Sequence, residues 1–126
     1  MATILVIDDD ELVSRTLQRA LKMYDYQVMT ANSGIEGLQL ARRHRPDLFI
    51  LDIMMPGVDG YQVCRQIRGD PLLKYLPVLF LTAKAKDEDK IEGFRAGADD
   101  YLIKQINMQE LELRVKAILR LSLIHK

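Results

Sequence analysis

The sequence predicts an α/β fold: a doubly wound, five-stranded parallel sheet in the order 2-1-3-4-5, with helices on both faces. Five short β-rich runs alternate with five segments of helical period along the 126 residues, and strict alternation favours parallel strands joined by right-handed crossovers. Three of the first four runs are apolar nearly throughout, as is typical of strands covered on both faces. No repeat or linker-like segment divides the chain. We therefore expect one domain over residues 1–121, with 122–126 as a tail or the start of a linker.

The expected strands are short runs dominated by aliphatic and aromatic side chains, which suit a sheet. In chain order they are Thr3–Ile7, Tyr26–Thr30, Asp47–Leu51, Pro77–Leu81 and a shorter Tyr101–Ile103. The segments between them carry the helical period, so each strand is followed by one helix.

The first two helices have a clear face or clear ends. The first has an apolar stripe at helical spacing, formed by Val13, Leu17, Ala20, Leu21 and Tyr24. The second begins at Ser33, with Glu36 at the spacing of a capping box. A basic cluster followed by Pro46 predicts its end. Cations complement the negative end of the helix dipole, and proline does not continue a helix.

The last three helices are also bounded by recognisable signals. The third spans about 60–68 and the fourth about 88–96, and a glycine follows each, at 69 and at 97. The fifth begins at Asn107, with Glu110 completing a capping box. Its apolar face buries Leu111, Val115 and Ile118.

Composition excludes several functional classes. Lys+Arg and Asp+Glu are equal at 18 each, so the domain has no bulk positive charge for direct nucleic-acid or anionic-membrane binding. A single cysteine makes no internal disulfide. No apolar run approaches the ~18 residues of a membrane span, and the N-terminus lacks the basic region of a signal peptide. We therefore expect a cytoplasmic protein.

Charged and hydroxyl side chains follow the expected strands. Asp8, Asp9 and Asp10 come after the first strand, and Asp52, Thr82 and Lys104 end the third, fourth and fifth. Because ligands of such sheets bind outside the carboxyl ends of the strands, these groups are candidates for a single site. One of the first three aspartates is expected only to cap the first helix.

These residue types suit phosphoryl chemistry with a divalent cation. Crowded carboxylates repel one another, and a hard cation such as Mg²⁺ removes that cost while keeping several waters. Such a cation between Asp9 and Asp52 would neutralise an incoming phosphoryl group and let a carboxylate attack phosphorus. Thr82 would hydrogen-bond one phosphoryl oxygen, Lys104 would pair with another, and the small Ala83 leaves room for the group to enter.

At this point the sequence resembles a known family. The segments ILVIDDDE (4–11), FILDIMMPGVDGYQVCRQIR (49–68), VLFLTAKA (78–85) and GADDYLIK (97–104) resemble, in order, the receiver domain of bacterial two-component response regulators. The resemblance covers about residues 3–121. It implies a phosphorylation-dependent switch of a phosphorelay. Such a domain phosphorylates and dephosphorylates itself and is not a turnover enzyme.

The resemblance also implies a role for each site residue. Asp52 would be the phospho-acceptor, and Asp8, Asp9, Asp52 and the backbone carbonyl of Met54 would hold Mg²⁺. Thr82 and Tyr101 would form the switch, the tyrosine rotamer following the hydroxyl, and Lys104 would bind the phosphoryl group. The chain departs from the pattern where Gln105 replaces the family's usual cis-proline. A cis bond before another residue costs about 3–4 kcal/mol, so the geometry of the Lys104–Gln105 peptide stays open.

Two alternative functions remain on the same kind of sheet. A phosphatase of the haloacid-dehalogenase type would also use an aspartyl phosphate, but it places an acid two residues after the nucleophile, where this chain has Met54. An FMN-binding protein of the flavodoxin type needs a phosphate loop after the first strand, where this chain has three carboxylates. Both are disfavoured.

The implied partners are a histidine kinase or a histidine phosphotransfer domain as phosphoryl donor. Phosphorylation would pair two receivers through the face of helix 4, strand 5 and helix 5, with Asp100 of one chain contacting Arg114 of the other. The connection over 70–76 resembles receivers of diguanylate-cyclase regulators and hybrid proteins more than those of winged-helix transcription factors. The last helix resembles both groups, so the output stays open.

Overall fold

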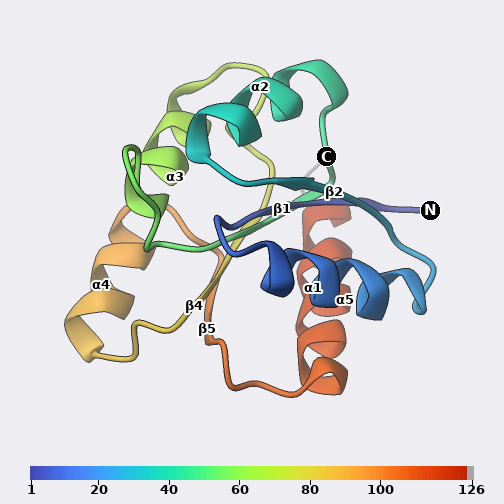
Figure 1. The fold of residues 1–126 in the computed structure, drawn as a ribbon. Coiled ribbons are helices and arrows are strands. Elements are labelled where there is room, and N and C mark those ends of the chain that lie inside the picture. Colours follow the sequence, from blue (N-terminus) through green and yellow to red (C-terminus); the bar gives the residue numbers. More distant parts are fainter. Residues whose placement is uncertain (125–126) are drawn as a thin grey trace.

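The computed structural model describes residues 1–124, which form a five-stranded parallel sheet with five helices (Figure 1). The sheet order is β2-β1-β3-β4-β5, as predicted. In chain order the elements are β1 (Thr3–Ile7), α1 (Glu11–Lys22), β2 (Gln27–Ala31), α2 (Gly34–His44), β3 (Leu48–Leu51), α3 (Gly60–Gly69), β4 (Val78–Thr82), α4 (Asp87–Arg95), β5 (Asp100–Ile103) and α5 (Met108–Ile124).

The sheet separates two apolar cores. On one face, strand residues such as Phe49 and Phe80 pack with Leu38 of α2 and with Val63 and Ile67 of α3. On the other face lie residues of α1 and α5, among them Leu17, Leu21, Leu111, Val115 and Ile118. Figure 1 shows α2 and α3 above the sheet and α1 and α5 below it. The central strands β1, β3 and β4 are buried almost throughout, which explains their near-continuous apolar sequence.

Helix caps follow the sequence signals in most places. Asp10 is the N-cap of α1, where its carboxylate accepts from the amides of Leu12 and Val13. Asn107 accepts from the amide of Glu110 at 2.7 Å, as its spacing predicted. At α3, where no cap was expected, Asp59 and Gln62 form a complete capping box.

The prediction that Tyr24 belongs to the apolar stripe of the first helix is wrong. The helix ends at Lys22 and the chain turns through Asp25, whose φ is +68°. Tyr24 therefore leaves the helical face and is 42% exposed. Leu17 and Leu21 of the stripe are buried, and the predicted Val13 packs against the same core, partly buried.

The C-terminal helix is longer than expected. α5 continues to Ile124, three residues past the expected domain end at 121, while residues 125 and 126 of the expected tail lie outside the described residues. Within residues 1–124, no helix is both long enough and apolar enough to cross a membrane.

Candidate functional site

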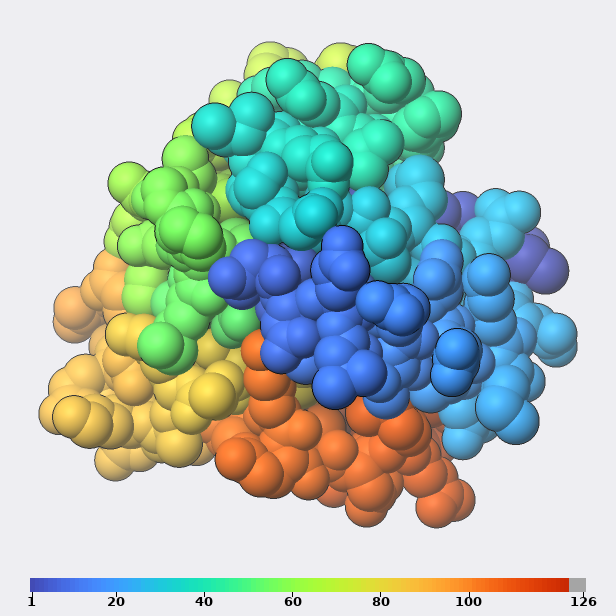
Figure 2. All heavy atoms as spheres, viewed as in Figure 1, coloured from blue at the N-terminus to red at the C-terminus, as the bar shows by residue number. Residues whose placement is uncertain are grey.

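The loops after β1, β3, β4 and β5 meet at one edge of the sheet. In Figure 2 their surfaces, coloured blue, green, yellow and orange in chain order, adjoin one another on the face in view. Parallel pairing of β1 with β3, β3 with β4 and β4 with β5 places these strand ends next to one another. Three polar side chains there are buried: Asp8, Asp52 and Thr82 are 3%, 4% and 0% exposed. These buried polar side chains therefore gather at the edge of the sheet where ligands of such folds bind.

Lys104 joins the two buried carboxylates. Its Nζ lies 3.0 Å from Asp8 Oδ2 and 3.0 Å from Asp52 Oδ2. These three residues come from the ends of β1, β3 and β5, so only the folded sheet brings them together. Charge-assisted contacts of this length are among the stronger hydrogen bonds in proteins. The sequence placed these residues correctly at one edge.

The electrostatics of the site are set by burial and by this shared lysine. Burial raises the pKa of Asp8 above its usual value, and the amide of Asp10 and the Lys104 ammonium offset this only in part. Burial also opposes the charge of Lys104, but its hydrogen bonds to Asp8 and Asp52 outweigh that effect and raise its pKa. Lys104 is therefore fully charged at neutral pH, ready to pair with a further anion.

The backbone around Asp52 is tightly packed. Asp52 Oδ1 accepts from the amide of Ile53 at 2.7 Å and from that of Met54 at 3.4 Å. Gly60, the first residue of α3, donates its amide to the Ile53 carbonyl at 3.0 Å. A Cβ at Gly60 would overlap the Asp52 carbonyl oxygen, so only glycine lets α3 approach this loop so closely. The sequence alone carried no signal for this contact.

Three carboxylates are placed to hold a cation. Oxygen atoms of Asp8, Asp9 and Asp52 all lie within 4.8 Å of one another. An all-oxygen donor set that combines buried and exposed carboxylates fits Mg²⁺, which is held by few carboxylates and keeps waters. Asp10 caps α1 instead, as expected for one of the three aspartates. The side chain of Met54 is 56% exposed, and a ligand role for its backbone carbonyl stays a prediction.

Thr82 and Tyr101 are linked through the loop after β4. The Thr82 hydroxyl accepts from the amide of Lys84 at 3.4 Å, and the Tyr101 hydroxyl donates to the carbonyl of the same residue at 2.9 Å. The Tyr101 ring is buried, 7% exposed, against Phe80. Gly93 of α4 makes room for it, since a Cβ there would lie 2.8 Å from the ring. The sequence marked Tyr101, but it carried no signal for Gly93.

Gln105 and Cys64 are not among the residues of this site. The described residues contain no cis peptide bond, so the Lys104–Gln105 peptide is trans. Cys64 is fully buried in the core of α2 and α3.

Comparison with known proteins gives a consistent result. Residues 4–116 match the response regulator receiver domain family. The chain is 42% identical over 120 residues to the transcriptional regulatory protein AfsQ1 of Streptomyces coelicolor, covering 95% of this chain and 52% of AfsQ1. It is 46% identical over 119 residues to the alkaline phosphatase synthesis transcriptional regulatory protein PhoP of Bacillus subtilis, covering 94% and 49%. The chain thus spans about half the length of these relatives.

Solved structures agree with the fold. The chemotaxis protein CheY4 of Vibrio cholerae has a TM-score of 0.89 at 31% identity, covering 94% of this chain and 98% of CheY4. A two-component response regulator from Clostridium difficile has a TM-score of 0.89 at 30% identity, covering 95% and 97%. None of these relatives is a phosphatase of the haloacid-dehalogenase type by name. With the family match, the sheet order and the acidic strand ends in agreement, the chain belongs to the response regulator receiver domain family of two-component systems.

Proposed function

We propose that this receiver domain accepts a phosphoryl group on Asp52 from a histidine kinase or a histidine phosphotransfer domain, with Mg²⁺ bound, and so changes the face of α4, β5 and α5. One observation carries the proposal: the Lys104 ammonium lies 3.0 Å from both Asp8 and Asp52 beside the three-carboxylate cluster. A buried carboxylate, a cation and a group of oxygen ligands are the parts that phosphoryl transfer needs. The domain is assigned to residues 1–121.

Each residue has a distinct part in the proposed transfer. A carboxylate oxygen of Asp52 forms a bond to phosphorus as the phosphorus–nitrogen bond of the donor histidine breaks, and the imidazole leaves. Lys104 pairs with a phosphoryl oxygen, and the Thr82 hydroxyl donates to another. Asp8, Asp9, Asp52 and the Met54 carbonyl would hold Mg²⁺, which supplies positive charge to neutralise the phosphoryl oxygens.

The same site accounts for self-phosphorylation and self-dephosphorylation. Small donors such as acetyl phosphate need no protein partner, because the groups that stabilise the transferred phosphoryl belong to this chain. Water then removes the group from Asp52, so no substrate is turned over beyond the domain's own aspartate. A cytoplasmic location stays a prediction of this proposal.

The proposed switch uses the loop after β4. When Thr82 turns toward the phosphoryl group, the space that it leaves admits the ring of Tyr101. The inward position of that ring and its hydrogen bond to the Lys84 carbonyl support this step. The ring lies under Gly93 of α4, so its movement reaches the surface of that helix.

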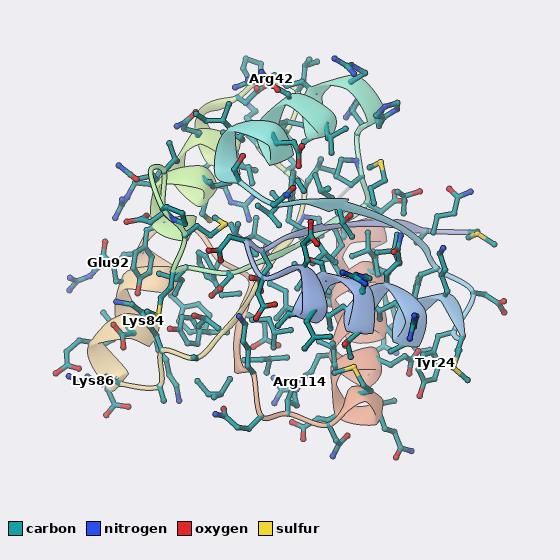
Figure 3. All side chains as sticks on the ribbon, viewed as in Figure 1. Tyr24, Arg42, Lys84, Lys86, Glu92 and Arg114 are labelled. Carbon is teal, nitrogen blue, oxygen red and sulfur yellow. The ribbon has the colours of Figure 1, made fainter. Side chains whose placement is uncertain are left out.

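The surface next to the switch suits a second receiver. Ile91 and Phe94 of α4 are each 51% exposed, and Leu113 of α5 is 56% exposed. Arg114, labelled in Figure 3, pairs with Asp100 at 2.9 Å within one chain. The sequence analysis expected this pair between two chains. In a two-fold dimer, Arg114 would leave Asp100 of its own chain and pair with Asp100 of the other chain. Phosphorylation-dependent dimerisation through this face is part of the proposal.

Intact-mass measurement with acetyl phosphate tests the proposed function. We expect one added phosphoryl group with Mg²⁺ present and none with EDTA or in Asp52→Asn. The matched control is Asp47→Asn, an aspartate at the opposite end of β3 from Asp52, which should be phosphorylated like the wild type. Equal labelling of Asp52→Asn and the wild type would overturn the assignment.

A further inference from the structure

Tyr61 of α3 forms a contact with α4 that the proposed function does not use. Its hydroxyl donates to the main-chain carbonyl of Asp89, in the first turn of α4, at 3.0 Å. Its ring packs edge-on against Phe80 at 5.8 Å between centroids, and Phe80 in turn packs against Tyr101 at 5.9 Å. Three aromatic rings from α3, β4 and β5 thus form one aromatic cluster beside α4.

α4 has few other attachments to the molecule. Its only buried residue is Gly93, and its apolar Ile91 and Phe94 are half exposed. Two ion pairs reach it: Lys84 Nζ lies 3.7 Å from Asp89, and Arg65 of α3 contacts Glu92 (Figure 3). Both pairs are partly exposed, and such pairs contribute little. The C-cap residue Ala96 is buried in the core, so the first turn of α4 is the part whose position depends largely on the aromatic cluster.

Two tyrosine hydroxyls hold the segment that runs from β4 into α4. Tyr101 holds its start through the Lys84 carbonyl, and Tyr61 holds the first helical turn through the Asp89 carbonyl. Burial raises the pKa of both phenols. The Tyr61 and Tyr101 side chains also shift each other's pKa, so the two phenols interact directly. Both therefore stay protonated and act as donors at neutral pH.

The Asp89 contact depends on where Tyr101 lies. α3 is fixed in the core by Val63, Cys64 and Ile67, so Tyr61 does not follow a movement of α4. If the Tyr101 ring turned outward, α4 would lose the ring that packs against Gly93, together with the hold on the Lys84 carbonyl. A shift of the helix by a fraction of its turn would then break the Tyr61 hydrogen bond.

We propose that Tyr61 is a positioning residue of the switch: its hydrogen bond to Asp89 fixes the first turn of α4 in the arrangement in which Tyr101 points inward. This inference rests on the proposed function, because it assumes that occupation of Asp52 favours that arrangement. By linkage, a bond present mainly in one state raises the population of that state, and so raises the apparent affinity of any ligand that prefers it. Tyr61 therefore increases the affinity of the site for a phosphoryl group without touching it.

Beryllofluoride, a mimic of the phosphoryl group, tests this coupling in the full chain with Mg²⁺. Tyr61→Phe keeps the ring on Phe80 and removes only the hydroxyl. We expect its beryllofluoride affinity to fall about two- to tenfold, the range set by one hydrogen bond. Amides in the first turn of α4 should exchange faster in the bound variant than in the bound wild type. Tyr75→Phe is the matched control, because Tyr75 is 83% exposed and lies in the connection after α3; it should bind as the wild type does.

The outcomes separate this inference from the proposed function. A purely structural role of Tyr61 would lower thermal stability equally with and without the mimic and leave the affinity unchanged, which would overturn the inference. If the wild-type chain binds no beryllofluoride, or Asp52→Asn binds it equally well, the proposed function fails and the inference fails with it. Wild-type binding that Asp52→Asn abolishes and Tyr61→Phe weakens supports both.

Discussion

At the scale of single residues, the site depends on the balance between charge and burial. Asp8 and Asp52 are buried beside each other, and the ammonium of Lys104 is the cation that the structure places against both. Removing one partner from such a group leaves an uncompensated buried charge, which is costly. The lysine therefore stabilises the empty site and provides the positive charge for an incoming anion.

We expect Met54 to influence the lifetime of the proposed phosphoryl aspartate. It lines a hollow of about 420 Å³ together with Lys84, among other residues. The apolar Met54 does not orient a water for in-line attack, and Lys84 offers no acceptor for its proton. We expect Met54→Asn to shorten the lifetime by up to about tenfold, below the 10²–10⁴ of a true general base. Loss of label is followed by mass after the donor is removed. Met54→Leu should decay as the wild type does, and an unchanged or longer lifetime in Met54→Asn would contradict this account.

Cys64 gives the folded chain a pH-dependent stability. Burial raises the pKa of its thiol from the ordinary 9.0 to about 11. Because the folded-state pKa is the higher one, the stabilising contribution is complete below pH 9 and is lost as the pH rises toward 11. Urea unfolding of the wild type and of Cys64→Ala, at pH 8 and at pH 10.5, measures it. The gap between the two free energies of unfolding should shrink by about 2 kcal/mol; a constant gap would show that the thiol ionises freely in the fold.

At the scale of elements, Arg68 fastens the end of α3 to two later segments. Its guanidinium donates to the carbonyls of Gly97, Lys74 and Leu76 and to the carboxylate of Asp99. Asp99 also accepts from the amide at the start of β4. One side chain thus joins α3, the 70–76 connection and the turn before β5.

We expect Arg68→Ala to lower the free energy of unfolding by about 2–4 kcal/mol, because the two part-buried carbonyls of Gly97 and Leu76 lose their donor. Arg65→Ala is the control: Arg65 lies on the same helix, and its ion-pair partner within residues 1–124 is the partly exposed Glu92. Such pairs contribute about 0–1 kcal/mol. Urea unfolding at neutral pH compares the two. Equal losses in the two variants would show that the Arg68 contacts add nothing beyond an exposed ion pair.

The contrast between these elements shows what sequence predicts well. Strand order and the positions of Asp8, Asp52, Thr82 and Lys104 follow from apolar runs and from the residue after each run, which are local signals. The Arg68 and Tyr61 contacts join main-chain carbonyls 29 and 28 residues away. No residue type marks a carbonyl as an acceptor, so such contacts appear only once the backbone is placed.

At the scale of the whole molecule, α4 is held less firmly than the other helices. α1, α2, α3 and α5 each contribute apolar side chains to a core, whereas α4 buries little more than Gly93. Elements with few buried contacts have low local stability and are those that move in switches. We therefore expect occupation of the site to act on α4 and through it on the proposed face of α4, β5 and α5.

Dimerisation is the proposed whole-molecule consequence. We expect sedimentation with Mg²⁺ and beryllofluoride to show a higher mean mass than without the mimic, and Arg114→Glu to abolish the rise, because it places a like charge against Asp100. Exposed pairs contribute about 0–1 kcal/mol each, so a shifted equilibrium is expected and not an obligate dimer. Arg120→Glu, a similar change elsewhere on the exposed surface of α5, should dimerise as the wild type does. A rise of equal size in Arg114→Glu would place the contact on another face.

Locating the phosphoryl group on the chain tests directly whether Asp52 is the phospho-acceptor. Borohydride reduces an acyl phosphate on aspartate to homoserine, which peptide mass spectrometry assigns to one position. After treatment with acetyl phosphate and Mg²⁺, we expect homoserine at position 52 alone, and none when Mg²⁺ is removed. Homoserine at Asp8 or Asp9 instead, or no dependence on Mg²⁺, would contradict this expectation.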